Sequence, residues 1–150
     1  ILSDIRSNEN VGSLFRTADT VGIEKVYLCG ITPAPIDRFG RSVQAIAKTA
    51  LGAEKNIPWQ QVKDVQMIIK KLKKEGYQIV AIEQDDRAVD YKQVSVVFPV
   101  AFILGNEVGG LSREILQEVD IIAEIPMVGG KESLNVSVAG GVALFRMLGV

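Results

Sequence analysis

Glu107 lies in a short glycine-rich segment, residues 104–110, whose residue types could do chemistry. The glycines around Asn106 and Glu107 predict a tight loop with one carboxylate at its tip. A phosphate-binding loop would carry a cation or bare amides there, so the carboxylate favours a ligand with hydroxyl or amine groups, or a cationic ligand. Alternatively, Glu107 could cap the helix that follows. The spacing alone gives the two interpretations equal weight.

Arg16, Ser133 and Asn135 are further candidates. Arg16 lies one turn into a predicted helix that begins at a polar loop, and Ser133 and Asn135 lie at the start of a helix that is poor in bulky residues. Each also has a common structural explanation, because arginine is frequent on surfaces and Ser and Asn are frequent helix caps. Taken one at a time, these residues identify no activity.

The chain has no histidine and one cysteine, Cys29. This excludes Ser-His-Asp and Cys-His catalysis and removes imidazole as an acid–base group. It also predicts that there is no metal site and no internal disulfide. Any reaction must use Arg, Lys, Glu, Asp, Ser, Asn and backbone groups, which favours positioning and electrostatics over covalent catalysis.

Two apolar runs and one helix must position these side chains. Residues 100–104 end at a glycine and residues 121–125 end at a proline, as buried strands would. Ser133 stands where the N-cap of the following helix belongs. Two strand ends and a helix start therefore converge, which is where open α/β sheets bind ligands. Small residues in that helix predict a close approach of other backbone, namely Gly140, Gly141 and Ala143.

The rest of the chain predicts the sheet that carries this crevice. Asn10 is the expected N-cap of a helix over residues 11–21, and a strand over residues 25–29 follows so closely that a parallel sheet is favoured. We expect one α/β domain over residues 1–150. Its other elements are strands at 1–5 and 78–83, an extended piece at 57–59, and helices at 41–51, 62–75 and 111–119, the last capped by Ser112 or by the turn at 109–110.

The composition is that of an ordinary globular protein, with 47% hydrophobic and 23% charged residues and a net charge of −1. No apolar run approaches the roughly 18 residues of a membrane span. The lone cysteine and the absence of a signal-peptide pattern favour a cytoplasmic protein. A nucleic-acid partner would require a local basic patch, because the chain as a whole is not basic.

Three segments together resemble the signature motifs of the SpoU (TrmH-like) RNA methyltransferases of the SPOUT superfamily. They are Asn10-x-Gly12-x-x-x-Arg16-Thr17-Ala18, then Leu104-Gly105-Asn106-Glu107-x-Gly109, then Ile125-Pro126-Met127 with Ser133-Leu134-Asn135-Val136-Ser137-Val138-Ala139. The order and spacing match, and the resemblance covers nearly the whole chain. The segments at 48–53 and 58–59 also resemble one bacterial branch of the family.

The resemblance implies a mostly parallel sheet flanked by helices, with a deep trefoil knot in residues 100–150. It implies a homodimer whose active site combines both subunits. It further implies transfer of a methyl group from S-adenosylmethionine to a ribose 2′-hydroxyl of tRNA or rRNA.

By position, the resemblance implies roles for residues of all three motifs. Arg16 would act on the target 2′-hydroxyl and Asn10 would support its loop. Guanidinium is effectively never deprotonated, so Arg16 suits stabilisation of a developing alkoxide better than proton abstraction. The other residues placed in the transfer pocket are Glu107, Ser133 and Asn135. The residues placed around the cofactor are Leu104, Gly105, Asn106, Glu107, Gly109, Ile125, Met127, Ser133, Leu134, Asn135 and Ala139.

RNA recognition is expected from the dimer surface or from a segment before Ile1, since the 150 residues contain no additional RNA-binding domain. The candidate surface residues are Arg6, Arg38, Arg41 and Lys48. Two departures from the family pattern are Val108, where a glycine is usual, and Phe145-Arg146, which replaces an acidic ending. Two other functions stay open, a catalytically silent RNA-binding protein of this fold and a small-molecule methyltransferase.

Overall fold

The computed structural model describes residues 1–150 and contains one seven-stranded sheet in the order β3-β2-β1-β6-β4-β7-β5. Every neighbouring pair of strands is parallel, which confirms the predicted sheet. The strands are β1 (Leu2–Ser3), β2 (Val26–Cys29), β3 (Trp59–Val62), β4 (Gln78–Ile82), β5 (Val89–Asp90), β6 (Val100–Leu104) and β7 (Ile121–Glu124). The helices are α1 (Asn8–Thr20), α2 (Gln44–Ala50), α3 (Ala53–Asn56), α4 (Val65–Lys74), α5 (Arg113–Glu118) and α6 (Val136–Leu148).

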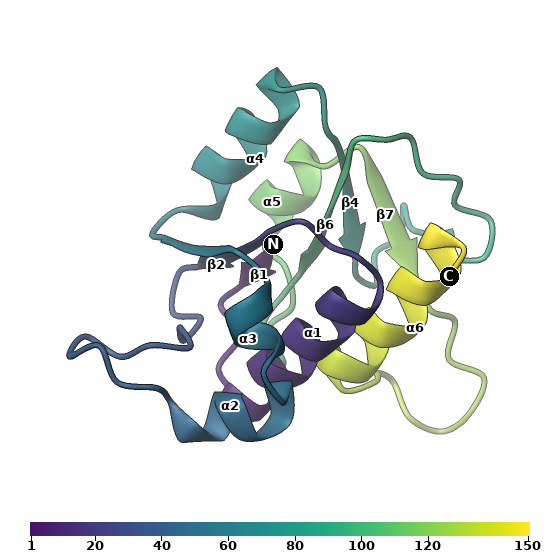
Figure 1. Cartoon of the computed structure of the whole chain (residues 1–150). Coiled ribbons are helices and arrows are strands. Elements are labelled where there is room, and N and C mark those ends of the chain that lie inside the picture. Colours follow the sequence, from purple (N-terminus) through teal and green to yellow (C-terminus); the bar gives the residue numbers. More distant parts are fainter.

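Helices cover both faces of the sheet, α1, α2, α3 and α6 on one and α4 and α5 on the other (Figure 1). Strand β4 shows why its sequence is continuously apolar. Val80 and Ile82 join the larger core cluster, while Ile79 and Ala81 join the smaller one behind the sheet. Strands buried on both faces have no polar alternation, as expected for a parallel sheet.

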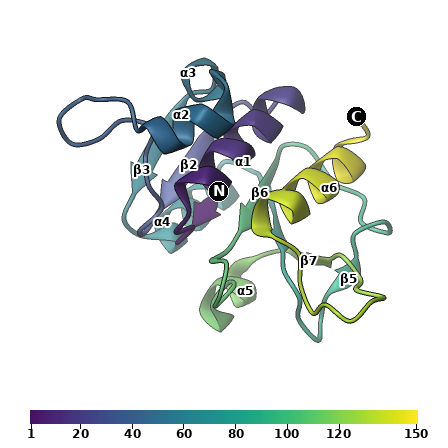
Figure 2. The ribbon, with the colours of Figure 1, turned by 90° about the horizontal axis from the view of Figure 1, so that it is seen from below.

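The end of the chain returns to its beginning, because α6 packs beside α1 (Figures 1 and 2). Strand β6 likewise pairs with β1, with Leu104 opposite Leu2. Since all strands are parallel, their carboxyl ends and the loops that follow them lie at one edge of the sheet. The trefoil knot expected for residues 100–150 stays a prediction. All helices of the structure are too short or too polar to cross a bilayer.

Two predicted helix caps are wrong. Ser7, not Asn10, caps α1, and its Oγ accepts a hydrogen bond from Asn10 N at 3.1 Å. Asn135, not Ser133, caps α6, because its Oδ1 accepts from Ser137 N and Val138 N. Serine and asparagine are both good N-cap residues, so the local sequence does not choose between the two candidates at either helix. Contacts with distant parts of the chain decide which residue caps the helix.

Three predicted boundaries also change. Val62 does not begin the fourth helix but ends the edge strand β3, and α4 starts after Asp64, which accepts from Gln66 N. The helix predicted from residue 41 starts at Gln44. Strand β5 lies in what the sequence indicated to be a polar connection.

Candidate active site

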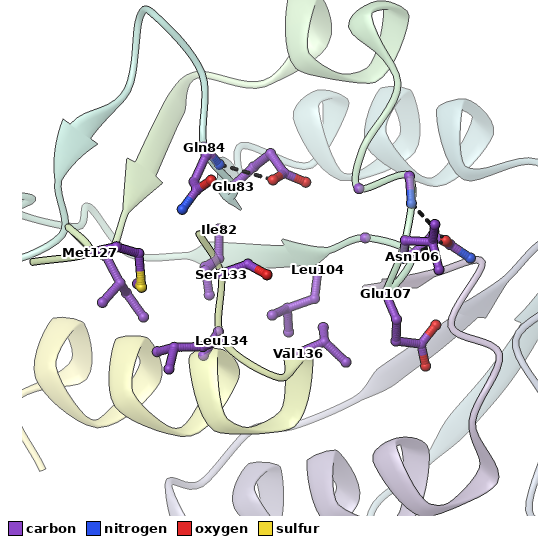
Figure 3. Close-up of a pocket in the computed structure, with 16 residues that line it drawn as sticks. Ile82, Glu83, Gln84, Leu104, Asn106, Glu107, Met127, Ser133, Leu134 and Val136 are labelled. Carbon is purple, nitrogen blue, oxygen red and sulfur yellow. Dashed lines mark hydrogen bonds between the residues drawn. The ribbon is translucent and has the colours of Figure 1, made fainter. Parts of the chain in front are cut away.

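An open cavity of about 260 Å³ lies at the carboxyl edge of the sheet, between the ends of β4 and β6 and the segment that leads into α6 (Figure 3). Every residue that the sequence placed around a cofactor lines this cavity, except Asn135. Their role in binding stays a prediction. The lining residues are Ile82, Glu83, Gln84, Leu104, Gly105, Asn106, Glu107, Val108, Gly109, Gly110, Ile125, Met127, Ser133, Leu134, Val136 and Ala139.

Asn106 organises the loop after β6. Its Oδ1 accepts hydrogen bonds from Val108 N and Gly109 N, both at 2.9 Å, and its Nδ2 donates to the Asp4 carbonyl at 2.7 Å. The loop turns back so closely that a Cβ on Gly105 would lie 2.6 Å from the Gly110 carbonyl carbon. Only glycine fits this approach, which exposes the backbone of the loop to the cavity.

Glu107 does not cap the helix that follows, since Ser112 has that role. Its carboxylate turns towards α1 (Figure 3). It accepts hydrogen bonds from Arg6 N, Ser7 N and the Asn10 side chain at 2.9–3.0 Å. Partial burial by itself would raise the pKa of Glu107, but these hydrogen bonds outweigh it and lower the pKa below its ordinary value of 4.5. The carboxylate is therefore held ionised and acts on the position of α1.

Asn10 links all three motifs. Its Nδ2 donates to Glu107 Oε1 and its Oδ1 accepts from Asn135 Nδ2, both at 3.0 Å. Asn135 in turn caps α6 with its remaining oxygen. Asn135 thus lies outside the cavity lining and positions the helix that forms one wall.

Glu83 and Gln84 are cavity residues that the sequence did not indicate. Glu83 Oε2 accepts from Leu111 N at 2.8 Å, which fixes the end of the loop after β6. Gln84 Nε2 donates to the Glu132 carbonyl at 2.7 Å and so holds the segment before α6. A signal was present, because two polar residues directly follow a buried strand at the edge where such sheets bind ligands.

One wall of the cavity is apolar. Leu104, Met127, Leu134 and Val136 surround the cavity in Figure 3. Ser133 faces the cavity, and its side chain makes no hydrogen bond to the rest of the chain.

Val108, the departure in the second motif, is 85% exposed at the rim of the cavity. Gly140 lets α6 approach, since a Cβ there would lie 2.7 Å from a methyl group of Leu14, whereas Gly141 meets only Thr17 Oγ1 at 3.9 Å.

Arg16 is exposed on α1 and does not line the cavity of its own chain. Its guanidinium has no carboxylate within ion-pair distance. The predicted RNA-binding residues are also exposed and outside the cavity, namely Arg6 before α1, Arg38 and Arg41 in the loop after β2, and Lys48 on α2. Of the second departure, Phe145 is exposed on α6 and Arg146 Nη2 donates to the Lys92 carbonyl.

The sequence model of the SpoU rRNA Methylase family matches residues 1–145. A putative TrmH family tRNA/rRNA methyltransferase of Staphylococcus haemolyticus is 33% identical over 147 residues, which cover 98% of this chain and 56% of that protein. An uncharacterized tRNA/rRNA methyltransferase of Archaeoglobus fulgidus is 34% identical over 146 residues, or 97% of this chain and 62% of that protein. The chain thus spans little more than half the length of these curated relatives.

Solved structures show the same fold. The AdoMet-bound rRNA methyltransferase from Sinorhizobium meliloti superposes with a TM-score of 0.87 at 30% identity, over 97% of this chain and 53% of that one. The A. aeolicus TrmH/SpoU tRNA modifying enzyme superposes with a TM-score of 0.84 at 27% identity, over 98% of this chain and 71% of that one.

Proposed function

The chain belongs to the SpoU rRNA methylase family, and on that basis we propose that it transfers a methyl group from S-adenosylmethionine to a ribose 2′-hydroxyl of tRNA or rRNA. The observation that carries this proposal is the meeting of three distant segments at one cavity. Asn10, Glu107 and Asn135 are joined by hydrogen bonds at its edge. That arrangement connects the helix bearing Arg16 to the cavity wall.

The cavity suits S-adenosylmethionine by its chemistry. Leu104, Met127 and Leu134 offer apolar contacts for the flat adenine ring, while the glycine-rich loop after β6 leaves backbone groups accessible. Glu83 adds a carboxylate, whose unused lone pairs suit hydroxyl or ammonium groups. The cofactor, when bound, supplies a methyl group on a positively charged sulfur, which is already activated towards a nucleophile.

Positioning is the main task of the chain in this reaction. The ribose oxygen must approach the methyl carbon in line with the bond that breaks, and holding reactants in such a geometry can supply a large part of the acceleration. Glu107 is held ionised by three donors, so it orients α1 and is a poor proton acceptor. Ser133 faces the cavity with a free hydroxyl, which suits a contact to cofactor or ribose.

Arg16 would stabilise negative charge that develops on the 2′-oxygen, because a fixed cation is favourable where charge appears. Since it lies outside the cavity of its own chain, we assign it to the site of a partner in a homodimer. An apolar stripe on α6 supports this assignment. Val138, Val142 and Phe145 repeat at helical spacing and are 50%, 39% and 38% exposed beside α1.

The testing experiment offers labelled S-adenosylmethionine with tRNA and, separately, rRNA from cells that lack the modification. The RNA is then digested and its labelled nucleosides are identified. Label in a 2′-O-methyl nucleoside is the expected result, and label in a base would contradict the ribose assignment. Cofactor binding without transfer to either RNA would favour a silent RNA-binding protein, and turnover without RNA would favour a small-molecule enzyme.

A further inference from the structure

The loop between β2 and α2 ends in a narrow hairpin. An antiparallel bridge joins Ile36 to Ser42, and Asp37 N donates to the Arg41 carbonyl at 2.9 Å. Gly40 N donates back to the Asp37 carbonyl at 3.0 Å, and its φ of +77° is the left-handed conformation that closes such a turn. The tip of the hairpin is therefore Arg38, Phe39 and Gly40.

Asp37 makes this tip rigid. Its Oδ1 accepts from Phe39 N at 2.8 Å and from Arg41 N at 2.9 Å. Its Oδ2 pairs with both Nε and Nη2 of Arg41, each at 2.9 Å. One carboxylate thus holds the turn and one of its two arginines, at a tip where residues 38–41 are all exposed.

Phe39 is presented to solvent on this support. Its side chain is 66% exposed, and two guanidinium groups lie over its ring, with their central carbons 4.7 Å (Arg38) and 5.0 Å (Arg41) from the ring centroid. Asp37 neutralises Arg41, whereas Arg38 has no carboxylate within ion-pair distance. The tip therefore combines an exposed aromatic ring with one uncompensated positive charge.

The hairpin lies at the same edge of the sheet as the candidate active site. It follows the carboxyl end of β2, and the cavity follows the carboxyl ends of β4 and β6. Only β1 separates β2 from β6, so the two strand ends are about 10 Å apart. From there the loop projects away from the body beside α2 in both views (Figures 1 and 2), too far from α6 to line the cavity.

We propose that this hairpin binds an unpaired nucleotide of the RNA substrate, with the base stacked on Phe39 and a phosphate contacted by Arg38. The identification of the substrate as RNA rests on the function proposed above. An aromatic ring beside arginines is the arrangement on which single-stranded bases stack, because every base has a π-face and the backbone is anionic. A base in a duplex is not accessible in this way, so the hairpin selects a loop or bulge near the methylated ribose.

Binding to a short RNA tests this directly. The probe is oligouridylate of about 12 nucleotides, a length within the usual range for stacking sites, compared with the same strand paired to its complement. Phe39→Ala should weaken binding of the single strand about 10-fold, as loss of one stacked base does, and Phe39→Tyr should restore it. Met67→Ala is the matched control, since Met67 is 64% exposed and lies on α4, away from the two arginines of the hairpin.

A second readout reports the ring itself. Trp59 is the only tryptophan, so Trp59→Phe gives a background in which Phe39→Trp introduces a single indole. Its fluorescence should be quenched by the single strand and not by the duplex. Arg38→Gln should lower the slope of log binding constant against log salt concentration by about the value of one phosphate contact. Lys63→Gln removes the same charge outside the hairpin and should leave this slope unchanged.

The outcomes separate this inference from the function proposed above. Quenching by RNA without methyl transfer would support the hairpin and oppose the methyltransferase. Normal methyl transfer with unaltered binding and KM in Phe39→Ala would overturn the hairpin and leave the methyltransferase standing. Sedimentation gives a further outcome that would overturn the hairpin proposal. If Phe39→Ala shifts the protein towards monomers and leaves the RNA affinity unchanged, the ring belongs to a protein contact.

Discussion

Asn135 donates a side-chain hydrogen bond to Asn10 at 3.0 Å, although 125 positions of the chain separate them. The bond fixes the orientation of both amides. Asn10 must present its oxygen to Asn135 and its nitrogen to Glu107, and Asn135 must keep its own oxygen for Ser137 N. The start of α1, the loop after β6 and the start of α6 are therefore joined by one continuous set of hydrogen bonds.

Substitution of Asn135 should separate its two tasks. Asn135→Ala removes the cap of α6, which costs about 1 kcal/mol, and the link to Asn10. Asn135→Asp keeps the cap and loses only the link, so the expected order of stability is wild type, then Asp, then Ala. Urea unfolding gives the order, and titration with S-adenosylmethionine reports the effect on the cavity. Equal losses for both variants would show that the cap contributes nothing.

Glu107→Gln should make stability depend less on acid pH. Because hydrogen bonds lower the pKa of Glu107 in the folded chain, its contribution is complete above the unfolded pKa near 4.5 and is lost as the pH falls through the folded pKa. The variant should be about 1 kcal/mol less stable near neutral pH, a modest value because the side chain is exposed to solvent. Thermal unfolding across pH should show the two proteins converging as the pH falls through the lowered folded-state pKa of Glu107. A constant difference would mean that the carboxylate charge is irrelevant.

Gly12→Ala should be destabilising. A Cβ at Gly12 would overlap Thr49 Oγ1 and the Ile46 carbonyl oxygen, so α1 and α2 would have to separate. Overpacking of this kind costs about 1–3 kcal/mol. The matched control is Gly141→Ala on α6, where the nearest atom is 3.9 Å away and alanine favours the helix. Denaturant midpoints should fall for the first variant and stay or rise for the second.

Arg16→Ala should abolish methyl transfer and leave cofactor binding nearly intact, because Arg16 does not line the cavity. Loss of one donor to a developing oxyanion typically lowers the rate about 100-fold or more. Calorimetric titration with S-adenosylmethionine measures binding, and label transfer to RNA measures the rate. Weakened cofactor binding would assign Arg16 to the cofactor instead.

Val142→Glu should produce monomers if α6 forms the dimer interface. A charge in the middle of the apolar stripe of Val138, Val142 and Phe145 would be buried without a partner. Sedimentation velocity measures the mass. Met67→Glu places the same charge on α4, on the opposite face of the sheet, and should leave the mass unchanged.

The central strands were predictable because they are buried on both faces. β2, β4, β6 and β7 are apolar runs that end at a glycine, a proline or a polar residue, and all four lie within one residue of the predicted limits. The edge strands were not. Gln60 and Gln61 make half of β3 polar, and β5 has only two residues, so neither gives a periodic pattern.

The place of the candidate site was predictable from the strand ends and the helix start that converge there, but the roles of its residues came only from the motifs. Spacing favoured neither interpretation of Glu107, because its partners Arg6 and Ser7 lie about 100 positions away. The motif gave Arg16 a role, yet no local pattern indicates that it lies outside the cavity of its own chain. Glu83 belongs to no motif, and its contact with Leu111 N exists only in the folded chain.

The return of α6 to α1 also has a consequence for biosynthesis. The cavity requires residues from Ile82 to Ala139, and its edge requires Asn10 near the other end of the chain. On the ribosome, the first two-thirds of the polypeptide can form helices and β2–β3 pairs, but the cavity cannot assemble before the last helix has emerged. A nascent chain therefore lacks the complete cavity until its last helix has emerged, and such late, long-range assembly favours slow folding.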